Sequence, residues 1–166
     1  ITFWMLRTRY GEGRVAYWLL KSEPSVYSID HLVKKPKKTD VWDGVRNYQA
    51  RNFMRDQMQK GDLAFFYHSN CPVPGIVGIV RITGPASHDQ TAFDPKSDYY
   101  DPKSDPESPR WFQVPVTFVE KFPEVISLTT LKTIEFSDEF ALIRKGNRLS
   151  VMPVIAEDWQ TIIEIT

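Results

Sequence analysis

The stretch GDLAFFYHSNCPVPGIVGIVRIT, residues 61–83, decides the fold that this sequence predicts. Two of its parts, Leu63 to His68 and Ile76 to Thr83, are rich in β-branched and aromatic residues, which favour strands. The loop between them contains proline and glycine, which interrupt regular structure. We therefore predict two consecutive strands that pair antiparallel.

Shorter patterns on either side predict further strands. A β-type run covers Tyr17 to Lys21 and is closed by Pro24, since proline disfavours helix at the residue before it. Alternating apolar residues predict a strand over Trp111 to Phe122, and Pro115 places this strand toward an edge or a bulge. A last strand is predicted around Leu149 to Val154.

Helical signals lie between these strands. Ser28 offers an N-cap to a short helix, and a later segment repeats apolar residues on one helical face before Gly61, which is placed to end it. The predicted helices are Ile29 to Lys34, Arg46 to Lys60, Leu128 to Ile134 and Ala156 to Ile163. Together the elements predict a mixed α+β fold with a curved sheet or small barrel at its centre.

The chain is organised as one domain, because 166 residues is close to the usual size of one. Residues 1–16 do not share the regular pattern of the rest, so we interpret them as an N-terminal extension, either native or introduced by cloning, and residues 17–166 as the domain. Residues 89–107 are rich in proline, serine and aspartate and contain DPKSD twice. They predict a long surface loop, and such loops are often functional.

Composition excludes several classes of protein. The 21 basic and 21 acidic residues balance, so any contact with a polyanion must be a local patch. Cys71 is the one cysteine, which excludes an intramolecular disulfide and indicates a reducing intracellular compartment, cytoplasm or nucleus. The apolar runs are too short to span a bilayer, and the N-terminal run lacks the features of a secretory signal. We therefore expect no membrane partner.

Signals for catalysis are weak. The spacing of His68 and Cys71 is compatible with a metal corner, but no second pair of ligands accompanies it. Ser69 next to His68 resembles a nucleophile and base, yet neighbours in a strand point to opposite faces. Glycine-rich phosphate or dinucleotide motifs are absent from the sequence. We predict no catalytic residues, no metal and no cofactor.

The stretch VWDGVRNYQARN, residues 41–52, is the best candidate for a binding site. It sets a tryptophan, two asparagines and two arginines around a predicted loop that enters a helix. An indole can cover the face of a planar ligand, carboxamides can read its polar edge and guanidinium groups can hold a phosphate. Asp43 and Gly44 predict a turn that leaves Trp42 at an element boundary, although a core role for this indole is equally compatible with the pattern.

Motifs over most of the chain resemble the EVE domain family, from about Tyr17 to the C-terminus. The motifs are YWLLKSEP, SIDHL, VWDGVRNYQARN, GDLAFFYHSN, PGIVGIV, YYDPKSD, PRW and RLSVMPV. The family belongs to the PUA-like superfamily and is related to YTH domains. The resemblance implies a PUA-like fold, a twisted and partly closed β-barrel flanked by short helices.

The resemblance also implies a function, since YTH domains hold a methylated adenine in an aromatic cage and EVE domains are regarded as readers of modified bases. It implies a non-enzymatic domain that binds DNA or RNA with a modified, methylated base, single-stranded or flipped out of a duplex. The residues implied for the base pocket are Trp42, Trp18, Tyr67, Lys21, Ser22, Asn47, Asn52, His68 and Ser69, and those for phosphate are Arg46 and Arg51.

Two other interpretations stay open at this point. A pocket with His68, Ser69 and Asp43 nearby has groups for acid and base work, which favours an enzyme acting on nucleic acid or a nucleotide. Exposed aromatic residues are also typical of a protein-interaction module.

Overall fold

The central strand pair forms as the sequence predicts. The computed structural model describes residues 15–166, and the prediction for residues 1–14 lies outside this range. Strands β3 (Leu63–His68) and β4 (Gly75–Ile82) pair antiparallel, with Phe65 opposite Ile79. A bulge between Phe66 and Tyr67 shifts the register near the end of β3.

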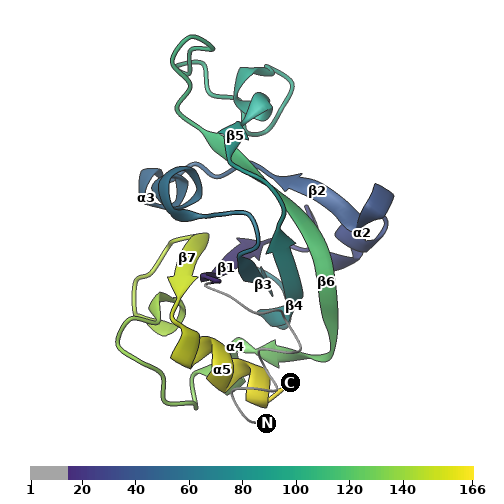
Figure 1. Ribbon diagram of the computed structural model, residues 1–166, viewed down its shortest axis with the longest axis vertical. Helices are drawn as coiled ribbons and strands as arrows, with labels where there is room; N and C mark the ends of the chain where they lie inside the picture. The colour runs from purple at the N-terminus through teal and green to yellow at the C-terminus, as the bar shows by residue number, and fades with distance from the viewer. Residues whose placement is uncertain (1–14) are drawn as a thin grey trace.

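The other strands extend this pair into one mixed sheet (Figure 1). β1 (Tyr17–Ser22) lies parallel to β3 and antiparallel to β7 (Val151–Val154). On the other side, β6 (Phe112–Ser127) pairs with β4, with β2 (Thr39–Trp42) and with the short β5 (Ser87–His88). The order is β2-β6-β4-β3-β1-β7, and no pairing within residues 15–166 joins its two ends. The α+β class is therefore confirmed, whereas closure into a partial barrel stays a prediction.

Strand β6 corrects the placement of Pro115 toward a sheet edge. β6 lies between β2 and β4, and Pro115 is opposite Val41. Pro115 lies where the pairing of β6 with β4 ends, and its carbonyl accepts the Thr83 N–H at 3.0 Å, so its carbonyl stays paired although it has no N–H to donate. The bulges of the β4–β6 pair lie elsewhere along the strands.

Strand β2 was not predicted, since its sequence was interpreted as part of a loop. Its register against β6 runs from Thr39 opposite Thr117 to Trp42 opposite Val114, and the first pair is joined by a 2.8 Å hydrogen bond between the two hydroxyl oxygens. Four residues carry little strand signal alone, so pairing with a distant strand decides their conformation.

The helices are short, and one prediction is wrong in length. α2 (Ile29–Val33) begins after Ser28, whose side chain caps it as predicted. The predicted helix from 46 to 60 is instead α3 (Tyr48–Asn52), followed by one π-helical turn, η2 (Phe53–Gln57). It ends before Gly61 because Met58 is extended and the Asp62 carboxylate accepts the Gln59 N–H.

The two remaining α-helices lie in the second half of the described chain. α4 (Leu128–Leu131) and α5 (Ala156–Glu164) occur where helices were predicted. Three 3₁₀ turns complete the set: η1 (Pro36–Lys38), η3 (Gln90–Phe93) and η4 (Ala141–Ile143). No helix formed by residues 15–166 combines the length and apolar character that crossing a bilayer requires.

Alternate residues along the strands feed two hydrophobic cores, one on each face of the sheet. On one face, Leu19 and Phe65 join Trp159 of α5, whose ring stacks on Phe65 at 3.9 Å. On the other face, Leu20 and Phe66 join residues of α2, α3 and β2. This second core supports the candidate site.

Residues 89–107 form the predicted surface loop, which extends beyond β5 at the top of Figure 1. The two DPKSD repeats form equivalent turns, because Asp94 accepts the Lys96 N–H and Asp101 accepts the Lys103 N–H. Trp111, where the chain leaves the loop, donates its indole N–H to Asp101. The loop is therefore held at its base, next to the candidate site.

Candidate functional site

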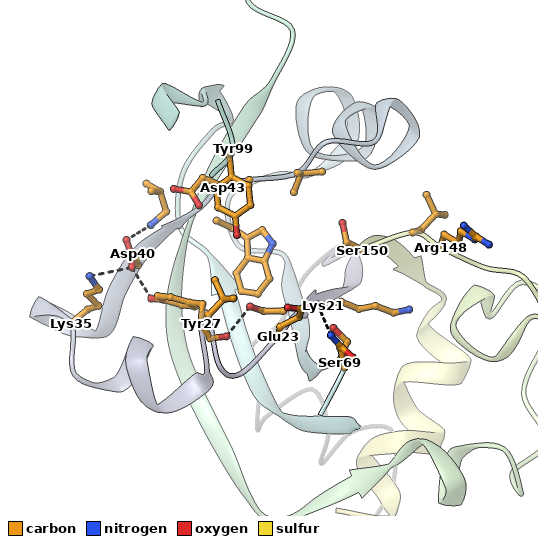
Figure 2. A pocket seen from close by; sticks show the side chains of 18 residues that line it. Lys21, Glu23, Tyr27, Lys35, Asp40, Asp43, Ser69, Tyr99, Arg148 and Ser150 are labelled. Atoms are coloured by element: carbon orange, nitrogen blue, oxygen red, sulfur yellow. Dashed lines mark hydrogen bonds and ion pairs between the residues drawn. The ribbon is translucent and has the colours of Figure 1, made fainter. Parts of the chain in front are cut away.

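A cavity of about 1310 Å³ opens where the parallel strands β1 and β3 end. Because parallel strands finish at the same edge of a sheet, Ser22 and Ser69 meet there, joined by a 2.9 Å hydrogen bond from the Ser69 N–H to the Ser22 carbonyl. Figure 2 presents the 18 lining residues. They come from the end of β1 and the residues that follow β3, from the segments before and after α2, and from β2 with the turn that follows it. The others come from the long loop and from the segment before β7.

Trp42 is both a wall of this cavity and part of the second core. It ends β2, with 6% of its surface exposed. Its ring meets Phe66 edge-on at 5.1 Å and Tyr27 edge-on at 6.4 Å. Tyr27 is held in turn by a 2.6 Å hydrogen bond from its hydroxyl to Asp40. The indole is therefore fixed in orientation.

Tyr99 comes from the long loop and lies against the turn that follows Trp42. Gly44 has φ +75°, and a Cβ at that position would lie 2.8 Å from the Tyr99 ring, so only glycine permits this approach. The Arg46 guanidinium donates to the Tyr99 carbonyl at 2.6 and 3.0 Å. In Figure 2 the Tyr99 ring points into the cavity beside Asp43.

Asp89 holds both the turn at Gly44 and the Arg46 side chain in place. Its side chain is fully buried and accepts hydrogen bonds from the Gly44 N–H at 2.8 Å, from Arg46 at 2.9 Å and from Thr91. Burial alone raises the pKa of Asp89, but the hydrogen bonds from Thr91, Arg46 and Gly44 together outweigh it and hold the pKa below its ordinary value. Asp89 is therefore an ionised, structural carboxylate.

Asp43 lines the cavity, and its pKa is shifted in the opposite direction to that of Asp89. Burial, followed by the nearby charges of Asp89 and Asp40, raises the pKa of Asp43 to about 6, and Arg46 opposes the shift only in part. Within residues 15–166, no ion pair or side-chain donor holds its carboxylate. Such a group is available to a ligand.

Two basic side chains line the opposite part of the cavity. Figure 2 places Lys21 and Arg148 on one side, and Asp40 with Lys35 on the other. The Lys21 ammonium lies 5.6 Å from the Tyr67 ring centre, and burial lowers the pKa of Lys21. The cavity therefore combines aromatic surface, a basic rim and one carboxylate, Asp43, that has no side-chain partner among residues 15–166.

The structure brings four of the predicted base-pocket residues together in the lining: Lys21, Ser22, Trp42 and Ser69. Several lining residues were not singled out for the pocket: Glu23, Tyr27, Asp40, Tyr99, Arg148 and Ser150. Four of these six lie in motifs that resemble the EVE domain family: YWLLKSEP, YYDPKSD and RLSVMPV. Tyr27 and Asp40 lie outside the family motifs.

The predicted carboxamides and phosphate-binding arginines lie outside the lining. Asn47 caps α3 by accepting the Ala50 N–H, and Asn52 accepts two hydrogen bonds from the Arg51 guanidinium. Arg51 also donates to the Arg110 carbonyl. Arg46 is occupied by Asp89 and by the Tyr99 carbonyl. Their predicted roles toward a ligand remain predictions.

Three further residues that were predicted for the base pocket also lie outside the cavity lining. Trp18 donates its indole N–H to the buried Asp62, and Tyr67 belongs to the core on the face of α5. His68 accepts the Ile29 N–H through Nε2, and burial lowers the pKa of His68. The cavity lining contains no histidine, and residues 15–166 contain no group of side chains arranged to hold a metal ion.

Gly44→Ala is expected to destabilise the protein by roughly 1–3 kcal/mol, because alanine is strained at positive φ, and to displace the Tyr99 ring. Urea unfolding measures the loss. Gly146→Ala is the matched control, since Gly146 has φ +80° but open space around a Cβ. Equal losses in both variants would mean that the contact with Tyr99 carries no energy.

Asp43→Asn is expected to stabilise the protein at pH 7.5. The folded-state pKa of about 6 lies above the usual 3.8, so the fold disfavours the ionised form and loses stability as pH rises from about 4 to about 6. The amide removes this deficit, so the two proteins should differ above pH 6 and converge below pH 4. Unfolding experiments across this range test it, with Asp98→Asn in the exposed loop as control. A gain equal at pH 4 and pH 7.5 would contradict the assignment.

The chain is similar to known proteins over most of its length. The EVE domain model matches residues 16–165. Thymocyte nuclear protein 1 of Mus musculus is 40% identical over 171 residues, which cover 93% of this chain and 75% of that protein. An uncharacterised protein of Schizosaccharomyces pombe is 35% identical, covering 90% of this chain and 68% of that protein.

Solved structures are similar over the same region. A Pseudomonas syringae protein superposes with a TM-score of 0.86 at 49% identity, covering 90% of this chain and 99% of that one. The human THYN1 protein, crystallised in complex with DNA containing 5-methylcytosine, has a TM-score of 0.84 at 38% identity, covering 90% of this chain and 96% of that one.

Proposed function

The chain belongs to the EVE domain family, and from this premise we propose that it binds a methylated base of a nucleic acid in the cavity lined by Trp42 and Tyr99. The human relative was crystallised with DNA that contains 5-methylcytosine, which makes this base in DNA the first candidate ligand. The proposed role is recognition without chemical change.

The observation that carries the proposal is the fixed aromatic surface in a cavity that is also lined by charged and hydroxyl side chains. Trp42 is held edge-on by Phe66 and Tyr27, and Tyr99 is held over Gly44 by Arg46. Stacking of a base on an aromatic ring contributes roughly 1–3 kcal/mol, and a methyl group adds apolar surface that gains from burial. A base inside a duplex cannot reach such a site, so the ligand is single-stranded or flipped out.

Phosphate contacts are assigned to the rim of the cavity. Arg148 and Lys21 line it, and residues 15–166 give neither side chain an ion pair. Arg46 is a weaker candidate, because its guanidinium already donates to Asp89, Thr91 and backbone carbonyls. A contact of this kind gives affinity that falls with salt and does not distinguish sequences.

The same geometry gives no support to an enzyme built on His68 and Ser69. His68 Nε2 is occupied by the Ile29 N–H, and the residue is absent from the lining that contains Ser69. A general base must lie within hydrogen-bond reach of the group it activates.

Fluorescence anisotropy with single-stranded DNA and RNA tests the proposal. Each oligonucleotide carries one cytosine, 5-methylcytosine, 5-hydroxymethylcytosine, adenine or N6-methyladenine at the same position. We expect preference for 5-methylcytosine in DNA, reduced about tenfold or more in Tyr99→Ala. Tyr100→Ala is the matched control, since Tyr100 is exposed and does not line the cavity. Equal, weak binding of every oligonucleotide by all three proteins would refute the proposal.

A further inference from the structure

An aromatic site alone cannot select 5-methylcytosine in DNA. Thymine carries the same 5-methyl group on the same ring and is present throughout DNA. The two bases differ at positions 3 and 4: cytosine has an N3 acceptor and a 4-amino donor, whereas thymine has an N3–H donor and a 4-carbonyl acceptor. A group that faces position 4 and can only accept hydrogen bonds therefore discriminates between them, because it bonds the amino group and repels the carbonyl oxygen.

We propose that Asp43 is this group: its carboxylate accepts the exocyclic N–H of a cytosine-type base and excludes thymine. The inference rests on the proposed function and adds a specificity-determining residue to it. Carboxylates are the side chains suited to the cytosine amino group, because an ionised carboxylate only accepts hydrogen bonds.

Elimination among the lining residues supports Asp43. Three carboxylates line the cavity. Glu23 accepts a hydrogen bond from Asn70, and Asp40 accepts the Tyr27 hydroxyl and pairs with Lys35 at 3.7 Å. Asp43 alone of the three has no side-chain partner within residues 15–166.

The serines of the lining are less suited to this selection. Ser22 already donates its hydroxyl to the Tyr27 carbonyl at 2.7 Å. Ser69 and Ser150 carry hydroxyls, which can rotate to donate or to accept, so they satisfy an amino group and a carbonyl equally.

The position of Asp43 fits a role at the edge of a stacked base. It follows Trp42 directly and precedes Gly44, on which the Tyr99 ring rests. The Gly44 N–H is fixed to Asp89, so the backbone next to Asp43 is held before any ligand arrives. Figure 2 shows the Asp43 carboxylate beside the Tyr99 ring at the cavity.

The surrounding charges make this selection depend on pH. Asp40 of β2 and Asp89 repel a negative charge on Asp43, Arg46 attracts it, and Tyr99 is a neutral neighbour at these pH values. With a pKa of about 6, Asp43 is ionised at pH 7.5 and accepts hydrogen bonds. Near pH 5.5 it is mostly protonated, and its O–H then donates to the carbonyl of thymine.

The test is a two-by-two set of single-stranded oligonucleotides that carry cytosine, 5-methylcytosine, uracil or thymine at one position. This set separates the effect of the methyl group from that of the amino group. At pH 7.5 we expect wild type to bind 5-methylcytosine about tenfold or more tightly than thymine. In Asp43→Asn the ratio should approach one, because an amide both donates and accepts. Asp98→Asn, the matched control at an exposed carboxylate outside the lining, should keep the wild-type ratio.

A pH series on the unmodified protein tests the same inference without any variant. The preference for 5-methylcytosine over thymine should shrink as pH falls from 8 to 5.5. Equal binding of the two bases by wild type at pH 7.5, or a preference that survives unchanged in Asp43→Asn, would overturn the role of Asp43. In either case, a remaining preference for 5-methylcytosine over cytosine would leave the proposed function standing. Loss of the methyl effect itself would overturn both.

Discussion

Asp89→Ala is expected to lower the free energy of unfolding by roughly 3–5 kcal/mol, the usual cost of leaving a buried charge unpaired. The substitution leaves the Arg46 guanidinium, whose side chain is only 23% exposed, without its carboxylate partner. It also removes the acceptor of the Gly44 N–H. Urea unfolding at pH 7 measures the loss. Asp30→Ala is the matched control, because the Asp30–Lys121 pair is of similar length, 2.8 Å, but exposed, and such pairs contribute about 0–1 kcal/mol.

Asp89→Ala should also release the Tyr99 side of the cavity. Arg46 holds the Tyr99 carbonyl, and Asp89 holds both Arg46 and the turn at Gly44. We expect Asp89→Ala to lose selective binding even at temperatures where it remains folded, whereas Asp30→Ala binds normally. A loss of stability no larger than that of the control would contradict the structural role of the pair.

Protonation of Asp89 in acid should also lower the free energy of unfolding. Since the folded-state pKa of Asp89 lies below its unfolded value, its ionisation stabilises the protein above the unfolded pKa. That stabilisation is lost as pH falls through the folded pKa. Asp43 has the opposite sign, so the two neighbouring carboxyl groups respond oppositely to acid.

Trp42→Ala is expected to weaken both the fold and the binding. The side chain is 6% exposed and packs against Phe66 and Tyr27, so its removal should cost roughly 3–5 kcal/mol of stability. The same change removes a stacking surface worth roughly 1–3 kcal/mol of binding. Urea unfolding and anisotropy, both at a temperature where the variant is folded, measure the two losses.

Trp42→Phe separates these roles. Phenylalanine keeps apolar volume in the core but offers a smaller stacking surface, so we expect a smaller loss of stability and a measurable loss of affinity. Preserved affinity for 5-methylcytosine in folded Trp42→Ala would remove the indole from the binding site and leave it only its core role.

Much of the fold follows from local signals. The aromatic and β-branched runs of β3 and β4 predict strands wherever they lie in space, and Ser28 caps α2 through its own neighbouring backbone. The length of the helix after Asn47 was predicted less well, because the chain turns extended at Met58 and the Asp62 carboxylate then accepts the Gln59 N–H.

The site shows the same division. Trp42, Lys21, Ser22 and Ser69 were predicted, and they do line one cavity. Asn47 and Asn52 lie near Trp42 in sequence but outside the lining, where Asn47 accepts the Ala50 N–H and Asn52 accepts from Arg51. Distance along the chain is a poor guide to which side chains share a cavity.

Local sequence patterns were sufficient to predict which segments can form strands and helices, and longer motifs to predict the EVE domain family. Three features depend on tertiary contacts: Thr39–Trp42 becomes a strand, Tyr99 covers Gly44, and Asp43 is the lining carboxylate to which residues 15–166 give no side-chain partner. The physical reason is the range of the interactions. Propensity and capping act between neighbours, whereas the contacts of Arg46 with Asp89 and Tyr99 join residues 43 and 53 positions apart.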